Sequence, residues 1–181
     1  MQSIKPLCCR ASLLAIFLIP AVLLLSSCSD QKPDSSSIIL KNGLICTMDN
    51  GEPYTGKVHD VISSQILEYD VVDGLKDGNF SIYSSSGKVL ISGQIKKNRN
   101  EGLWQYFYPD GELESQGYFK NDVTSDKWLW YYPDGKLRRT GYYFDGKKDG
   151  KWTEYDDYGN VISEEVYRNN VKIAGMNEIL S

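Results

Sequence analysis

The chain has 181 residues, enough for one domain or for two small ones. Charged residues make up 24% of the sequence, close to the average of globular proteins, which argues against global disorder. Lys and Arg number 20 against 24 Asp and Glu, so the net charge is −4 and no nucleic-acid partner is expected. A single histidine nearly excludes zinc cages and histidine-based catalytic triads. The composition stands out in its 16 glycines and 13 tyrosines.

The first 27 residues have the pattern of a targeting segment. Two cations and no acid precede an apolar run of fifteen residues that ends at Leu25. The run is shorter than a membrane span, which needs about 20 residues, but it fits the apolar region of a secretory signal peptide. It closes with Leu25-Ser26-Ser27-Cys28, which resembles the lipobox of bacterial lipoproteins. The resemblance implies that residues 1–27 are removed and that Cys28 receives a diacylglycerol. The alternatives are an ordinary signal peptide and an N-terminal anchor helix.

Residues 28–37 are polar, include a proline and lack aliphatic side chains, which is typical of a flexible tether. A lipid on Cys28 would make the membrane one partner of the protein and place it in the cell envelope. By resemblance to Gram-negative lipoproteins, Ser29 after the cysteine favours the outer membrane. With that lipid in place, Cys46 is the one thiol left, and no internal disulfide is expected. We expect Cys46 to be a small buried strand residue, the alternative being a reactive or partner-linked thiol.

The rest of the chain repeats with a period of 24 residues, without gaps from residue 78 onward. Six columns recur in four units: Gly78, Gly102, Asp126 and Gly150; Phe80, Trp104, Trp128 and Trp152; Tyr83, Phe107, Tyr131 and Tyr155; Gly87, Gly111, Gly135 and Gly159; Val89, Leu113, Leu137 and Val161; Ile95, Phe119, Tyr143 and Tyr167. A shorter, degenerate unit precedes them. The predicted units are residues 56–77, 78–101, 102–125, 126–149 and 150–173, with an N-terminal cap strand region at 38–55 and a C-terminal cap or tail at 174–181.

Each unit has the pattern of a β-hairpin. The segment 104–108 is rich in strand formers, and Pro109-Asp110-Gly111 then predicts a tight turn. The second connection, as in residues 98–102, is polar and contains glycine, so we expect a longer loop there. A glycine inside the return strand is expected to leave room for a neighbouring ring, at Gly93, Gly117 and Gly141. The predicted fold is all-β: one elongated antiparallel β-meander of about five 24-residue β-hairpin repeats.

The segment GLWQYFYPDGELESQGY, from Gly102 to Tyr118, resembles the MORN repeat, and is most similar to the bacterial variant found in proteins labelled YwqK-type antitoxins. The resemblance covers about two-thirds of the chain, with Asp126 and Glu165 as departures from the glycines of the pattern. It implies an elongated, gently twisted antiparallel sheet in which each unit contacts its neighbours. The family shares a scaffold and no single reaction.

Columns that keep one residue type are best explained by packing, and the tryptophans belong to them. Three other columns change along the chain and carry aromatic residues only in the two central units: Tyr106, Tyr108, Tyr118, Trp130, Tyr132 and Tyr142. Tyrosine and tryptophan give contact area with little loss of entropy, so these six residues are the predicted site for a protein or glycan partner. The alternative is that the rings only cover a thin sheet. Their faces depend on the hairpin register, which the sequence leaves open.

The sequence offers little for catalysis, and we expect neither catalytic nor metal-binding residues nor a cofactor apart from the lipid on Cys28. His59 stands alone and is expected in a loop or in solvent. Adjacent acids such as Glu164 and Glu165 point to opposite faces of a strand and cannot converge on one bond. Lysines at 96–97, 120 and 147–148 are expected to keep edges and loops soluble.

Three functions follow from the sequence. The first is a lipid-anchored envelope repeat protein that acts as a protein-binding or structural module. The second is an envelope glycan binder that uses aromatic stacking. The third is a YwqK-type antitoxin-like protein, which ranks last because a lipobox separates it from a cytoplasmic toxin.

Overall fold

The computed structural model describes residues 37–175. The predicted signal peptide, Cys28, nearly all of the predicted tether and residues 176–181 lie outside the described residues. Within 37–175 the chain forms strands and no α-helix, which confirms the all-β prediction. The strands are β1 (Ile38–Lys41), β2 (Leu44–Thr47), β3 (Gly56–Ile62), β4 (Gln65–Val72), β5 (Leu75–Tyr83), β6 (Val89–Lys96), β7 (Arg99–Phe107), β8 (Leu113–Lys120), β9 (Val123–Tyr131), β10 (Leu137–Phe144), β11 (Lys147–Lys148), β12 (Gly150–Tyr155), β13 (Val161–Arg168) and β14 (Val171–Gly175).

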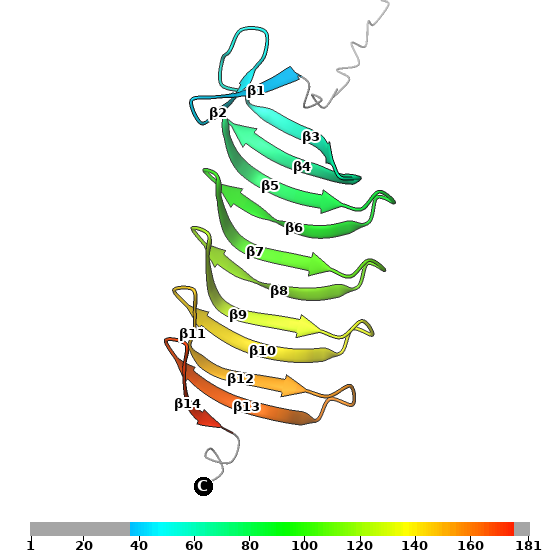
Figure 1. Ribbon diagram of the computed structural model, residues 1–181, viewed down its shortest axis with the longest axis vertical. Coiled ribbons are helices and arrows are strands. Elements are labelled where there is room, and N and C mark those ends of the chain that lie inside the picture. The colour runs from blue at the N-terminus through cyan, green and yellow to red at the C-terminus, as the bar shows by residue number, and fades with distance from the viewer. Residues whose placement is uncertain (1–36, 176–181) are drawn as a thin grey trace, which may run out of the picture. The chain divides into compact units, whose positions relative to one another are not determined.

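Strands β3 to β14 form one 12-stranded sheet in chain order (Figure 1). Every pair in it is antiparallel, and the short β11 pairs with β10. The sheet is the predicted meander of hairpin repeats. Apart from β11, each strand pairs with the strands that precede and follow it along the chain, so each unit contacts the units before and after it, as in other repeat proteins.

The Pro-Asp-Gly turns adopt the predicted geometry. Gly111 has a φ of 103°, where a side chain would be strained, and its N–H donates to the carbonyl of Tyr108 at 2.9 Å. The Tyr108 N–H in turn donates to the carbonyl of Glu112 at 2.9 Å. A register shift follows in the strands, between Tyr106 and Phe107. The turn therefore fixes where each hairpin is bulged.

The prediction of a longer loop at the second connection is wrong. Lys97 and Asn98 form a two-residue turn with φ values of 48° and 65°, and β7 already begins at Arg99. Asp145 and Gly146 repeat this geometry with φ values of 48° and 74°. Two consecutive positive φ values define the type I′ turn, whose twist matches a β-hairpin. The polar residues that suggested a loop supply these left-handed conformations, which Asn and Asp tolerate.

The type I′ turns also tie each unit to the preceding one. Side-chain oxygens of turn residues accept backbone N–H groups 22 residues earlier, with Asn98 accepting from Lys76 at 2.7 Å, Asp122 from Asn100 at 2.6 Å and Asn170 from Lys148 at 2.7 Å. These bonds recur at the unit spacing. They supply part of the interface that makes stacked units stable where a single hairpin is not.

The first residue of a unit lies at a bulge. Gly102 has a φ of 71°, and the register between β6 and β7 shifts beside it, between Ser92 and Gln94. Asp126, which departs from the glycine pattern, keeps the same left-handed conformation with a φ of 58°. A second shift between Gln116 and Tyr118 lies beside it. The backbone conformation is thus preserved where the residue type is not.

The two ends of the described chain differ. Residues 38–47 form a separate two-stranded hairpin, β1–β2, rather than an additional strand of the large sheet. The N-terminal region is joined to the first unit by hydrogen bonds from Ile45 N–H to the carbonyl of Gly74 at 2.9 Å and from Gly74 N–H to the carbonyl of Tyr54 at 2.8 Å. At the other end, β14 pairs with β13 as the last described strand of the large sheet.

Candidate functional site

One face of the sheet, here called the ladder face, carries the three tryptophans that recur at the same position of the 24-residue repeat. Trp104, Trp128 and Trp152 are only 5%, 7% and 5% exposed. Each indole N–H donates to a carbonyl of the preceding unit, that of Gln94, Tyr118 and Tyr142 respectively, at 3.1–3.3 Å. The prediction that this column serves packing is confirmed.

The return-strand glycines leave room for these rings, as predicted. A Cβ atom at Gly93, Gly117 or Gly141 would lie less than 3.0 Å from the indole of the next unit. Carbon atoms in contact are normally about 3.5–4.0 Å apart. Glu165 replaces the glycine in the last unit, where no tryptophan follows within the described residues. The departure therefore coincides with the end of the tryptophan column.

Tyr106 and Trp130, two of the six predicted site residues, belong to the ladder face. The ring centroid of Tyr106 lies 6.4 Å from that of Trp128, and Trp130 lies 5.9 Å from Trp128 and 5.5 Å from Trp152. Burial raises the pKa of the Tyr106 hydroxyl. The structure brings these two residues together through the tryptophans, in a row of rings that packs the single-layered sheet.

Tyr108 and Tyr132 connect neighbouring units. The Tyr108 hydroxyl donates to the carbonyl of Tyr131, and the Tyr132 hydroxyl donates to the carbonyl of Tyr155, each at 2.8 Å. Both tyrosines follow the strand and precede the Pro-Asp-Gly turn. Their geometry assigns them to the scaffold.

Tyr118 and Tyr142 lie on the opposite face. Tyr118 pairs with Leu103, the neighbour of Trp104, and Tyr142 pairs with Lys127, the neighbour of Trp128. Since side chains alternate along a strand, these residues point away from the ladder face. They are 45% and 44% exposed. Within residues 37–175 neither side chain takes part in a ring contact or a hydrogen bond. The six predicted residues thus divide into three pairs and do not share a face.

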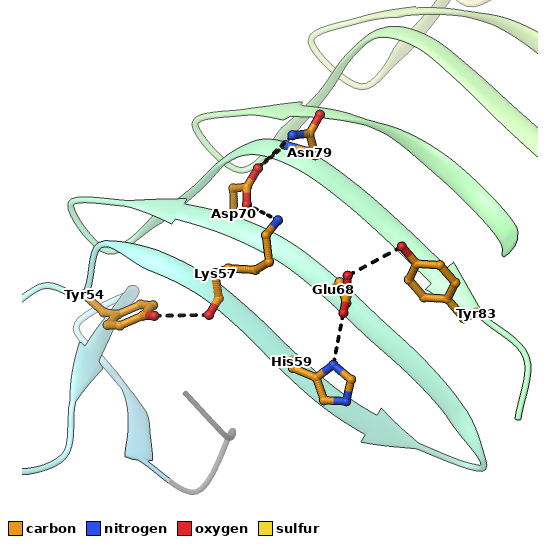
Figure 2. A network of polar contacts seen from close by, with 7 residues as sticks. All are labelled: Tyr54, Lys57, His59, Glu68, Asp70, Asn79 and Tyr83. Carbon is orange, nitrogen blue, oxygen red and sulfur yellow. Dashed lines mark hydrogen bonds and ion pairs between the residues drawn. The ribbon is translucent and has the colours of Figure 1, made fainter. Parts of the chain in front are cut away.

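A polar network occupies the opposite face near the N-terminal end of the sheet (Figure 2). Lys57 Nζ lies 2.6 Å from Asp70 Oδ1, and the backbone N–H of Asn79 donates to Asp70 Oδ2 at 2.8 Å. Burial alone would raise the pKa of Asp70, but the hydrogen bonds from Lys57 and Asn79 and the charge of Lys57 together lower it. The hydrogen bond to Asp70 likewise raises the pKa of Lys57. These pairings give the carboxylate a structural role.

The single histidine is part of the same network. His59 was expected in a loop or in solvent. It lies within β3 and not in a loop, and its side chain is 36% exposed. Its Nδ1 is 3.3 Å from Glu68 Oε1, and the hydroxyl of Tyr83 is 3.5 Å from Glu68 Oε2 (Figure 2). Cross-strand pairing of His59 with Glu68 explains this placement.

A cavity of about 230 Å³ lies over the C-terminal part of the ladder face, lined by Arg139, Lys148, Trp152, Glu154, Ser163 and Glu165. Lys148 Nζ lies 4.2 Å from the ring centroid of Trp152 and 4.8 Å from that of Tyr167. This lysine is therefore a cation–π partner of the ladder, beyond the solubilising role expected of it. Arg139 forms an ion pair with Glu154. Glu165, which also lines the cavity, pairs with Lys172 outside it, at 2.8 Å.

Two other predictions concern groups elsewhere in the chain. Cys46 is 3% exposed within β2, which confirms a buried strand cysteine. Cys28 lies outside the described residues. Among residues 37–175, no three acids, histidines or cysteines gather as metal ligands would, and no helix is long and apolar enough to cross a membrane.

Three segments of the chain, residues 100–121, 127–145 and 148–169, match the model of the MORN repeat variant. These segments of the sheet are similar to MORN repeats. They include all of β8, β10, β12 and β13, nearly all of β7 and the second half of β9, and they contain Tyr118 and Tyr142. No curated protein matches the chain. The resemblances to bacterial lipoproteins and to YwqK-type proteins remain predictions.

Other exposed apolar residues lie next to Tyr118 and Tyr142 and were not predicted from the sequence. Phe144 is 70% exposed and lies two residues after Tyr142 in β10. A signal for it was present in the repeat, because Lys96, Lys120 and Arg168 occupy the same column. Phe144 replaces the cation that the other three units carry at this position. The scaffold therefore does not require an aromatic side chain there.

Proposed function

We propose that the chain is a lipid-anchored protein of the cell envelope whose MORN-repeat sheet binds a protein partner, without catalytic activity of its own. The exposure of Tyr118 and Tyr142 carries the proposal. Both rings are nearly half exposed on the face opposite the ladder, and both stand outside the contacts that hold the sheet together. Exposed tyrosines free of structural contacts are typical of binding surfaces.

The membrane part of the proposal rests on the lipobox-like end of the apolar N-terminal run. It predicts that Cys28→Ser moves the protein from the membrane fraction to the soluble fraction and abolishes incorporation of labelled palmitate. Retention in the membrane without label would favour the alternative of an anchor helix.

The binding part is tested by affinity purification from detergent-solubilised envelopes, with a glycan array run in parallel. The test variant is Tyr118→Ser/Tyr142→Ser. Tyr158→Ser is the matched control, because Tyr158 is 84% exposed at a distant turn. We expect one protein to be lost from the double variant and kept by the control, with the melting temperature unchanged in both.

Other outcomes would contradict this proposal. A polysaccharide that needs both tyrosines would favour the glycan-binding alternative, and an exported toxin among the captured proteins would favour the antitoxin. If the wild type and the double variant captured the partner equally, the face that carries Tyr118 and Tyr142 would not be the binding surface.

A further inference from the structure

Tyr118 and Tyr142 are part of a larger exposed surface. Leu103, Val123 and Phe144 are 39%, 37% and 70% exposed. Leu103 pairs with Tyr118, Phe144 follows Tyr142 by two residues, and Val123 lines a cavity together with Phe144. We call these five residues the apolar patch: Leu103, Tyr118, Val123, Tyr142 and Phe144. It lies at the type I′ turn end of the two central units.

The repeat provides an internal reference for this patch. In the other complete units, the positions of Tyr118 and Tyr142 hold Gln94 and Val166, and that of Phe144 holds a cation. All units form the same hairpins, so the fold does not require aromatic residues there. The apolar patch is therefore a local addition to the scaffold.

Three lysines surround the apolar patch. Lys127 pairs with Tyr142, Lys147 pairs with Phe144, and Lys120 follows Tyr118 by two residues on the same face. All three are exposed. Among residues 37–175, none of their ammonium groups takes part in an ion pair or a hydrogen bond. Each exposed aromatic ring of the patch thus has beside it a lysine that forms no ion pair with the described residues.

The acids of this region are placed differently. Glu101 and Asp122 accept backbone hydrogen bonds from Asn121 and Asn100, at 2.9 and 2.6 Å. Asp126 pairs with Tyr143, which is part of the ladder face, and Asp145 lies in the turn. The strand positions that flank the apolar patch are therefore positive, although the whole chain has a net charge of −4.

A cavity of about 500 Å³ opens at the edge of the apolar patch. Its lining includes Lys120, Val123, Asp126, Phe144 and Asp145. Phe144 and Val123 contribute apolar side chains to the lining, Lys120 contributes one cation, and Asp126 and Asp145 contribute two carboxyl groups. An apolar side chain of a partner fits against Val123 and Phe144.

We propose that the apolar patch binds an acidic segment of a protein partner, in which aspartate or glutamate alternates with large apolar side chains. The inference rests on the proposed function and specifies the partner of that same surface. The apolar side chains contact Tyr142, Phe144 and Val123, and the carboxylates lie near Lys120, Lys127 and Lys147. Such complementarity favours one sign of partner and makes association dependent on salt.

The test measures binding of a fluorescent heptapeptide, with glutamate alternating with phenylalanine and leucine, to the full chain in neutral detergent. A second peptide carries lysine in place of glutamate. We expect the acidic peptide alone to bind, and its affinity to fall at least ~10-fold between about 0.05 M and 0.5 M NaCl, where screening removes the charge attraction.

Variants separate the two parts of the surface. Charge reversal of Lys120, Lys127 and Lys147 to glutamate is expected to weaken binding at least ~10-fold, while reversal of the distant Lys41, Lys88 and Lys136 changes the net charge equally and is expected to leave it intact. Phe144→Ser, at a largely exposed position, is expected to weaken binding without lowering the melting temperature.

Several results would overturn the inference: equal binding of both peptides, insensitivity to the three charge reversals, or binding to phosphatidylglycerol vesicles but not to the acidic peptide. These are distinguishable from failure of the proposed function. An envelope protein lost from Tyr118→Ser/Tyr142→Ser but kept by the charge-reversed variant would support the binding module and reject the acidic partner.

Discussion

Gly117→Ala tests the idea that the return-strand glycines exist to accept the tryptophans. A Cβ atom at position 117 would lie less than 3.0 Å from several atoms of the Trp128 indole, so the ring has to move. Trp128 also contacts Phe119, Tyr143, Tyr106 and Trp130, which limit where it can go.

The expected cost follows from three contributions. Forcing a methyl group into a packed site costs about 1–3 kcal/mol. Displacing the ring also weakens the hydrogen bond from the Trp128 indole to the carbonyl of Tyr118, worth about 0.5–1.5 kcal/mol. Replacing a strand glycine with alanine also stabilises the protein by about 0.5–1 kcal/mol, because it lowers the conformational entropy of the unfolded chain. The free energy of unfolding should therefore fall by about 2 kcal/mol, within a range of about 0.5–4 kcal/mol.

Urea unfolding followed by circular dichroism measures this change, and the near-ultraviolet signal reports on the indole environment. Trp128→Leu supplies the control background, since a smaller side chain leaves room for the methyl group. We expect the cost of Gly117→Ala to shrink to within about 0.5 kcal/mol of zero there, which is a coupling between the two sites. An equal cost in both backgrounds, or a cost below about 0.5 kcal/mol in the wild type, would refute the reasoning.

Three further predictions concern the scaffold. Tyr108→Phe and Tyr132→Phe each remove one hydroxyl bond between units, so each should cost about 1 kcal/mol in urea unfolding, and their sum should describe the double variant. Because Asp70 and Glu165 have lowered pKa values in the folded state, their stabilisation is present above the pKa of the unfolded carboxyls, about 4, and is lost as the pH falls. Asp70→Asn/Glu165→Gln should therefore flatten the decrease of melting temperature in acid, and an unchanged pH profile would contradict the role of these groups. Deleting residues 102–125 preserves the register and should leave a cooperative thermal transition, whereas deleting β14 should broaden it; equal loss of cooperativity in both would argue against independent stacking of units.

The period of the repeat made most of the fold predictable. Tryptophan, turn glycine and return-strand glycine recur at one spacing, and each has a physical role that a hairpin repeat explains. The type I′ turns escaped prediction although Asp145-Gly146 carries the Asp-Gly signature of such turns, because the equivalent Lys97-Asn98 lacks it and the polar residues around both were interpreted as a loop.

The arrangement of the candidate site was less predictable. The bulge at each unit opening and the second one beside the Pro-Asp-Gly turn shift the register, and a shift of one residue moves a side chain to the other face. Sequence alone therefore did not separate Tyr106, which packs in the ladder, from Tyr118, which is exposed. The hydrogen bond from the Tyr108 hydroxyl to the carbonyl of Tyr131 likewise could not be predicted, because its acceptor belongs to the next unit.

The order of the strands has a mechanical consequence. Apart from the short β11, strands β3 to β14 follow one another across the sheet, so a pull between the N-terminal end of the sheet and β8–β10 would act across the strands rather than along them. Such a load breaks the hydrogen bonds of one strand pair at a time, which resists force less than shearing all of them together. Each unit that detaches would release 24 residues, about 80 Å of extended chain. A repeat sheet of this kind would lengthen in steps under tension while the units still stacked keep their structure.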